Sequence, residues 1–249
     1  MLIVGAFDKL KSLTIATPFY NEELGLENFF GVLKKIEKLI NKKIKVKYLF
    51  IDDGSIDSTK IKLEEFKNQN PNLDINIFSH EKNMGYGKTL QNSIIIANTD
   101  YLITYDSDCT YDYNLIFYLL ENIEKHNHDI INVSYKLSPK KTKVSFFRKF
   151  LSWGSSVIYK IIFPEIGRYN ITVLTCSFRI YNLKKIKDIE LKSNDFNCCA
   201  EILIKSMKKK LNIHEIGGEN IGRKFGQSKM KIIKNIYNTL KTIVLIKIN

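Results

Sequence analysis

The chain has 249 residues, 44% of them hydrophobic, and a formal net charge of +13. This length and apolar content suit one α/β domain with a large core and argue against a disordered chain. The excess positive charge indicates an anionic partner: nucleic acid, a membrane surface or a phosphorylated substrate. The alternative is that the lysines only form a solvated surface.

In the first half of the chain, predicted strands and helices alternate. The strands cover 12–17, 45–52, 74–79 and 100–105, and the helices cover 24–40, 59–69 and 84–98. This alternation predicts a mostly parallel, Rossmann-like sheet covered by helices. Ligands bind beyond the carboxyl ends of such strands, where three polar loops follow: "PFYNEE" (18–23), "DDGS" (52–55) and "DSD" (106–108).

The second half follows no regular alternation, which is typical of a region shaped for a substrate. Helices are predicted at 113–127, 143–163, 196–210 and 231–248, and strands at 129–134, 173–181 and 211–217. The last helix is amphipathic, and its apolar face contains Ile232, Ile233, Ile236, Tyr237, Leu240, Ile243 and Val244. This face contacts a membrane surface, the protein's own core or a second subunit.

The cysteines and the N-terminus indicate a reducing compartment. The spacing of the four cysteines argues against a zinc site, so we expect buried, reduced thiols at Cys109, Cys176, Cys198 and Cys199. There is no signal-peptide pattern, and no apolar run approaches the ~20 residues that span a bilayer. We expect a cytoplasmic protein and leave open a peripheral position on the cytoplasmic face of a membrane.

The "DSD" loop predicts a divalent cation. Residues two apart project the same way, so Asp106 and Asp108 can converge on one ion, and their oxygens suit Mg²⁺ or Mn²⁺ shared with substrate phosphates. The alternative is that they cap the following helix, although Asp112 is better placed for that. The sequence has no Walker A, G-x-G-x-x-G, G-x-S-x-G or H-E-x-x-H motif, which argues against the enzyme classes that use them.

Seven segments in order resemble the motifs of one enzyme family. They are "TIATPFYNEE", "LFIDDGSIDST", "EKNMGYGKTLQNSI", "YDSDCTYD", "FFRKFLSWGSS", "TCSFRIY" and "GRKFGQSKM". Together they cover about 11–231 and resemble family 2 glycosyltransferases of the GT-A fold, most of all the dolichyl-phosphate mannose synthase or polyprenyl-phosphate glycosyltransferase branch.

The resemblance implies a domain organisation and an activity. A GT-A domain would cover 1–230, with a nucleotide-sugar-binding half at about 11–112 and an acceptor-side half at 113–230, followed by an amphipathic helix at 231–249. The enzyme would move a sugar from a nucleotide-sugar to an acceptor with inversion, using Mg²⁺ or Mn²⁺.

The resemblance also implies site residues. Substrate-binding residues would be Pro18, Tyr20, Glu22, Asp52, Asp53, Lys88, Ser107 and Glu201. Catalytic residues would be the metal-binding Asp106 and Asp108 and, around the phosphates, Arg148, Arg179, Arg223 and Lys229. Three alternatives stay open: an Asx turn for one of Asp52 and Asp53, a solvent-facing Lys88, and a salt bridge for Glu201.

The choice of acceptor depends on whether a general base is present. A sugar hydroxyl needs a base, but the chain has no Glu-Asp pair, and its best candidate, Asp195, is also suited to cap a helix. A phosphate is already anionic at neutral pH and needs cations instead. From 202 to 249 the chain has eleven Lys or Arg and two Glu, which favours a polyprenyl phosphate.

Three alternatives to this function remain. One is a soluble transferase that glycosylates a sugar hydroxyl in a polysaccharide or glycan. Another is a catalytically weak nucleotide-sugar-binding protein, because the chain departs from the family pattern at Thr110, Val173 and Ser177. A nucleic-acid-binding protein would also explain the charge, but the sequence has no RNP1, KH or zinc-finger signature, so we expect no specific nucleic-acid partner.

Overall fold

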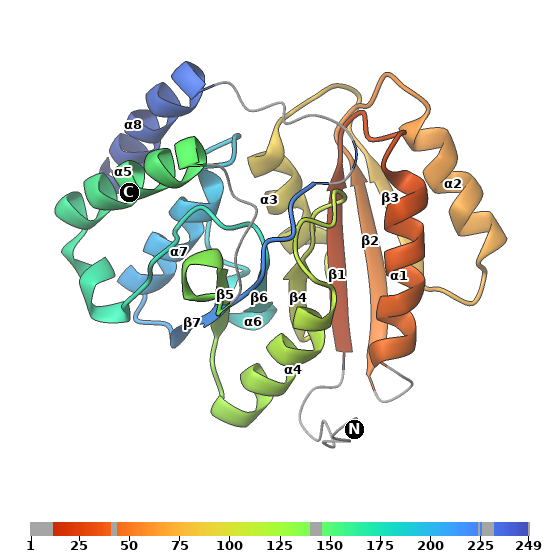
Figure 1. Cartoon of the computed structure of the whole chain (residues 1–249), viewed down its shortest axis with the longest axis horizontal. Coiled ribbons are helices and arrows are strands. Elements are labelled where there is room, and N and C mark those ends of the chain that lie inside the picture. Colours follow the sequence, from red (N-terminus) through yellow and green to blue (C-terminus); the bar gives the residue numbers. More distant parts are fainter. Residues whose placement is uncertain (1–11, 41–43, 140–145, 224, 226–231, 249) are drawn as a thin grey trace.

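A computed structural model describes residues 12–40, 44–139, 146–223, 225 and 232–248 (Figure 1). Its centre is a seven-stranded sheet in the order β3-β2-β1-β4-β6-β5-β7. All neighbouring strands are parallel except β6, which is antiparallel to both β4 and β5. The strands are β1 Ser12–Phe19, β2 Lys45–Asp52, β3 Ile75–Ser79, β4 Tyr101–Thr104, β5 Ile130–Ser134, β6 Arg179–Asn182 and β7 Ile213–Gly217.

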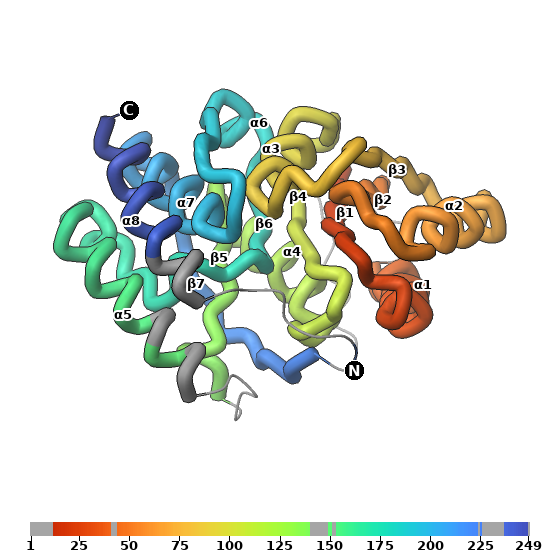
Figure 2. The backbone as a smooth tube through the Cα atoms, turned by 90° about the horizontal axis from the view of Figure 1, so that it is seen from above, coloured from red at the N-terminus to blue at the C-terminus, as the bar shows by residue number. Residues whose placement is uncertain are grey.

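Helices cover both faces of the sheet. They are α1 Leu26–Ile40, α2 Thr59–Gln69, α3 Tyr86–Ile96, α4 Asn114–His126, α5 Phe146–Ile162, α6 Leu183–Ile186, α7 Cys198–Lys208 and α8 Ile232–Ile248, with 3₁₀ turns η2 Tyr135–Leu137 and η3 Pro164–Tyr169. Figure 2 shows α3 and α7 on one side of the strands and α1 and α4 on the other.

The two apolar layers follow from the period of two along each strand. In β2, Tyr48 and Phe50 join the core under α1, α2 and α4, while Leu49 and Ile51 join the core under α3, α5 and α7. This arrangement confirms the predicted α/β fold with a mostly parallel sheet. The four cysteines are buried thiols, as expected.

The predicted strand at 173–181 is wrong in extent. Only residues 179–182 form a strand, β6, and it runs antiparallel between β4 and β5. Phe178 O still accepts from Val133 N of β5, but residues further upstream bond to a side chain. The backbone N–H groups of Thr172 and Val173 donate to the carboxylate of Glu215, at 2.7 and 3.1 Å.

A buried polar network holds this antiparallel region together. Arg179 is fully buried, and its guanidinium donates to Asn132 Oδ1 and to the carbonyl oxygens of Leu174 and Cys199. Asn132 in turn donates to Glu215 Oε1 at 2.6 Å. The network joins β5, β6 and β7, so the buried charges are offset within the sheet rather than by solvent.

The C-terminal helix α8 packs on the protein, but not with the whole of its predicted apolar face. Ile243 and Ile246 are buried, while Tyr237, Leu240 and Val244 are exposed. The side chains of residues 232–236 lie outside those described. Among the helices that the structure describes, none combines the length and hydropathy needed to cross a bilayer.

Glu215→Gln should destabilise the fold. An amide places an N–H group against the backbone donors of Thr172 and Val173, so we expect the free energy of unfolding to fall by about 2–3 kcal/mol. Urea denaturation measures this, with Glu65→Gln as the control because Glu65 is exposed on α2. Equal stability of the two variants would contradict the structural role of the Glu215 carboxylate.

Candidate active site

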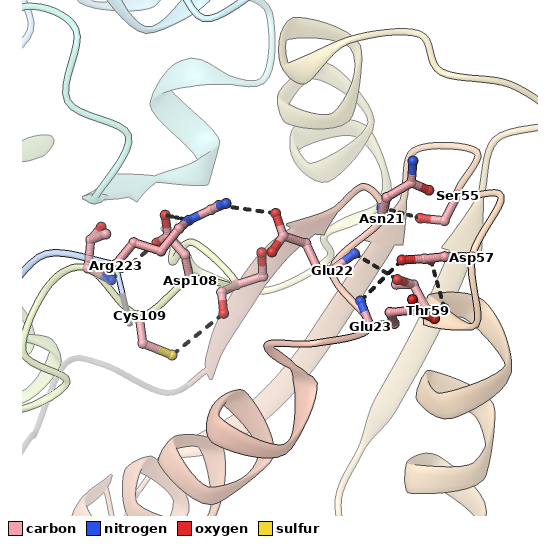
Figure 3. A network of polar contacts seen from close by, with 11 residues as sticks. Asn21, Glu22, Glu23, Ser55, Asp57, Thr59, Asp108, Cys109 and Arg223 are labelled. Carbon is pink, nitrogen blue, oxygen red and sulfur yellow. Dashed lines mark hydrogen bonds and ion pairs between the residues drawn. The ribbon is translucent and has the colours of Figure 1, made fainter. Parts of the chain in front are cut away.

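Three acidic side chains gather at the carboxyl-terminal edge of the sheet. β1 and β4 are adjacent and parallel, with Ala16 opposite Thr104. Their following loops therefore leave the same edge and bring together Glu22, Asp106 and Asp108, here called the carboxylate cluster. Figure 3 shows Glu22 and Asp108 on either side of one guanidinium.

That guanidinium belongs to Arg223. Its Nε donates to Asp108 Oδ2 at 3.0 Å and its Nη2 to Glu22 Oε1 at 3.1 Å (Figure 3). The segment before Arg223 lies against the "DSD" loop, because Ile221 N donates to Thr110 O at 2.8 Å. The chain thus brings together residues 106–111 and 220–223, which are more than 100 positions apart in sequence. As a result, the carboxylate cluster has a cation bonded to it.

The carboxyl of one cluster member, Asp106, has a raised pKa. Burial raises the pKa of its carboxyl to about 7, and the charges of Asp108 and Glu22 add to this, while Ser177 and Arg223 act in the opposite direction. Ser177 Oγ donates to Asp106 Oδ2 at 2.5 Å. The other oxygen, Oδ1, is buried and has no hydrogen-bond partner among the described residues.

The loop that contains Glu22 is fixed by the loop after β2. Asn21 N donates to Ser55 Oγ at 2.9 Å, and Glu22 N donates to Thr59 Oγ1 at 2.8 Å (Figure 3). Asp57 accepts a bond from Glu23 N, at 3.3 Å. The backbone of Glu22 therefore has a fixed position, and its carboxylate is presented to Arg223.

Asp53 and Asp52 organise the loops after β2 and β3. The Asp53 carboxylate accepts bonds from His80 Nδ1, Met84 N and Gly85 N, at 2.6, 2.8 and 2.9 Å. Asp52 Oδ1 accepts from Ser55 N at 3.3 Å, which is the turn-closing alternative considered for one of the two aspartates. The Asp53 carboxylate thus connects the end of β2 to the start of α3.

The glycine at 85 is required by a close approach. Its φ is +91°, and a Cβ there would lie 2.2 Å from Asn194 O. The start of α3 therefore lies directly against the loop that precedes α7.

Two predicted site residues, Arg179 and Glu201, make structural contacts in the interior of the protein. Arg179 is fully buried in the polar network described above and is not brought to the carboxylate cluster. Glu201 is fully buried as well. It accepts bonds from Lys192 N and Ser193 N, at 2.9 and 2.8 Å, and pairs with Lys205 at 2.8 Å, so the salt-bridge alternative is observed.

The remaining predicted residues lie near this edge of the sheet or outside the described side chains. Pro18 and Tyr20 are half-buried at the end of β1, and Ser107 is buried between the two aspartates. Lys88 Nζ donates to Gln91 Oε1 at 3.0 Å on α3. Lys229 lies outside the described residues, as does the side chain of Arg148 on α5.

Sequence reasoning did not place Ser177, Asn21 or Asp57 in the site. Ser177 bonds to Asp106, while Asn21 and Asp57 fix the loop of Glu22. Their signals were weak: Asn21 and Asp57 lie inside motif segments, and Ser177 lies two residues before a strand whose direction was not predicted.

The residues of this cluster fit a divalent metal ion. Asp106 Oδ1 is a buried oxygen in need of a positive partner, and carboxylate oxygens are what Mg²⁺ and Mn²⁺ prefer. Within the described residues, no group of three or more His, Cys, Asp or Glu has the geometry to hold a metal alone. The chain would therefore supply one or two ligands and leave the others to substrate phosphates or water.

Comparison with known proteins identifies relatives. The family model described as "Glycosyl transferase family 2" matches residues 14–190. A dolichol-phosphate mannosyltransferase of Pyrococcus furiosus is 25% identical over 92% of this chain and 64% of its own length. A dolichyl-phosphate beta-glucosyltransferase of Dictyostelium discoideum is 24% identical over 81% of this chain and 63% of its own length. The chain thus spans just under two thirds of each relative.

A solved structure supports the GT-A fold. Glucosyl-3-phosphoglycerate synthase of Mycobacterium tuberculosis, in complex with Mg²⁺ and uridine diphosphate, superposes with a TM-score of 0.72 at 12% identity. The match covers 95% of this chain and 79% of that one. At this identity the likeness shows the fold alone.

Asp106 should make stability depend on pH. An unfolded aspartate loses its proton near pH 4, whereas the folded protein keeps this proton to about pH 7. The folded state therefore binds more protons in that window, and stability falls as pH rises through it. Between pH 5 and 8, the free energy of unfolding of the wild-type protein should therefore fall by about 1–3 kcal/mol more than that of Asp106→Asn.

Urea denaturation in the presence of EDTA measures this difference, and the exposed Asp74→Asn is the control. The control should follow the wild-type profile. A difference between wild type and Asp106→Asn that is the same at pH 5 and pH 8 would contradict the raised pKa of Asp106.

Proposed function

Because the chain belongs to glycosyl transferase family 2, we propose that it moves a sugar from a nucleotide-sugar to a polyprenyl phosphate with inversion at the anomeric carbon. The observation that carries the proposal is the carboxylate cluster at the carboxyl edge of β1 and β4, with Arg223 bonded to it. Such an edge is where α/β sheets bind ligands.

The residues present account for binding and departure of the donor's diphosphate. Asp106 and Asp108 would hold Mg²⁺ or Mn²⁺, which supplies charge stabilisation to the leaving diphosphate. Pro18 and Tyr20 would line the nucleotide, and Asp53 would hold the loop of Met84 and Gly85 in place beside it. The acceptor oxygen forms its bond to the anomeric carbon as the bond to the diphosphate breaks.

A phosphate acceptor suits the acceptor side better than a sugar hydroxyl. The candidate base Asp195 uses Oδ1 to accept bonds from Asn197 N and Nδ2, at 2.7 and 2.9 Å, in the turn before α7. Burial lowers the pKa of Lys136 beyond the end of β5, and the nearby charge of Lys160 adds to this. Like charges held this close favour an anion beside them.

The polyprenyl chain of such an acceptor requires contact with a membrane. α5 and α8 lie side by side (Figure 1) and expose apolar side chains: Phe150, Trp153, Ile158, Ile161, Tyr237, Leu240, Val244 and Ile248. Lys149, Lys160, Lys241 and Lys247 are exposed on the same helices. Apolar and basic side chains together suit the headgroup region of an anionic bilayer, which would give a peripheral position on its cytoplasmic face.

Asp108→Ala should remove the metal-dependent part of donor binding. Wild-type melting temperature should rise with a suitable UDP-, GDP- or CMP-sugar, and more so with Mn²⁺, because binding to the folded state stabilises it. In the variant we expect the gain from Mn²⁺ to disappear, a loss of about tenfold or more in affinity. The exposed Asp188→Ala should retain it. An unchanged Mn²⁺ dependence in Asp108→Ala would contradict the role of Asp108.

Val244→Glu should weaken binding to anionic liposomes. Val244 is 54% exposed on α8, so a charge there should leave folding unchanged while removing apolar contact with lipid. Cosedimentation at low salt measures the bound fraction, and we expect a loss of about fivefold. Ile61→Glu, an equal change at an exposed position of α2, is the control. Equal losses in both variants, or no binding by wild type, would contradict the membrane face.

A further inference from the structure

The carboxylate cluster carries more negative charge than its described surroundings offset. Glu22 and Asp108 pair with the same guanidinium, and Asp106 lies beside them in the loop after β4, so three carboxylates share one cation. Arg223 is the cation bonded to the cluster within the part of the chain that the structure describes. Its guanidinium therefore serves as the counter-ion of this site when no ligand is bound.

Arg223 uses oxygens that a divalent ion would also use. Asp108 Oδ2 accepts from Nε at 3.0 Å, and Asp108 Oδ1 accepts from Thr110 N at 3.1 Å. Mg²⁺ must approach a carboxylate oxygen to about 2.0–2.1 Å. A guanidinium 3 Å from the same oxygen repels that ion, and this repulsion is strong where the groups are partly removed from water.

The backbone brings Arg223 to this position by contacts outside the cluster. Gly218 N donates to Ser134 O at 3.0 Å after the end of β7, and Ile221 N donates to Thr110 O. Gly222 has a φ of +77° directly before Arg223, a conformation that glycine adopts without strain. The side chain is the part of this segment that reaches the carboxylates, and 23% of it remains exposed. It can therefore change partners while the backbone stays in place.

We propose that Arg223 competes with the divalent ion for Asp108 and Glu22, and that the donor's diphosphate removes this competition by taking the guanidinium as its own partner. This inference rests on the proposed function. Arginine binds phosphate oxygens in pairs as readily as carboxylates. Metal and nucleotide then bind cooperatively, because each is favoured when Arg223 leaves the cluster.

Mn²⁺ binding without any sugar tests the competition. The full chain is titrated with Mn²⁺ alone, and free Mn²⁺ is followed by electron paramagnetic resonance. Arg223→Gln should bind Mn²⁺ about tenfold more tightly than wild type, within the usual range of coupling between sites. Arg223→Lys keeps the charge and should bind as weakly as wild type. Arg168→Gln has the same change of charge at an exposed position on η3 and should also match wild type.

The titration repeated with UDP or GDP tests the coupling. The nucleotide that binds wild type should tighten Mn²⁺ binding there by a larger factor than in Arg223→Gln, and melting curves verify that each variant is folded. Mn²⁺ affinity in folded Arg223→Gln that equals or falls below wild type overturns the proposal, as does an equal nucleotide effect in both. A lack of sugar transfer with every donor would contradict the proposed function but would leave the Mn²⁺ comparison unchanged.

Discussion

The candidate site is organised around the repulsion of like charges at one edge of the sheet. Parallel β1 and β4 deliver Glu22, Asp106 and Asp108 to the same place, and a carboxylate partly removed from water beside two others is costly. Arg223 offsets part of this charge. What remains is a site that favours added positive charge, which agrees with a donor whose diphosphate enters together with a divalent ion.

The antiparallel strand links the scaffold to this site. Arg179 fixes β6 between β4 and β5 through Asn132 and two backbone carbonyls. Directly before β6, Ser177 bonds to Asp106 through its hydroxyl, and its carbonyl accepts from Thr104 at the end of β4. The buried arginine thus positions a residue that touches the cluster, although its own guanidinium stays in the core. A network that stabilises the sheet therefore also orients one of the carboxylates.

The elements of the first half of the chain were predicted well because local patterns determine them. β2 has the predicted bounds, and the polar loops lie at the expected edge because parallel strands end together. The motifs alone could not show which arginine lies in the core and which lies in the site. Arg179 and Arg223 both lie in motif segments, but only the folded chain shows that the first bonds to buried carbonyls and the second to carboxylates at the edge of the sheet. The segment before β6 also bonds to Glu215, which is distant in sequence.

The two halves of the site differ in how their side chains are held, and this difference bears on catalysis. In the loops after β2 and β3, the Asp53 carboxylate bonds to the backbone N–H groups of Met84 and Gly85, and such bonds change only if the chain moves. Arg223 instead pairs side chain to side chain, where one anion can replace another without rearranging the fold. Pre-organised groups suit positioning of the nucleotide. An exchangeable cation suits a diphosphate whose negative charge grows as the bond to the sugar breaks, because it can strengthen its contact as that charge develops.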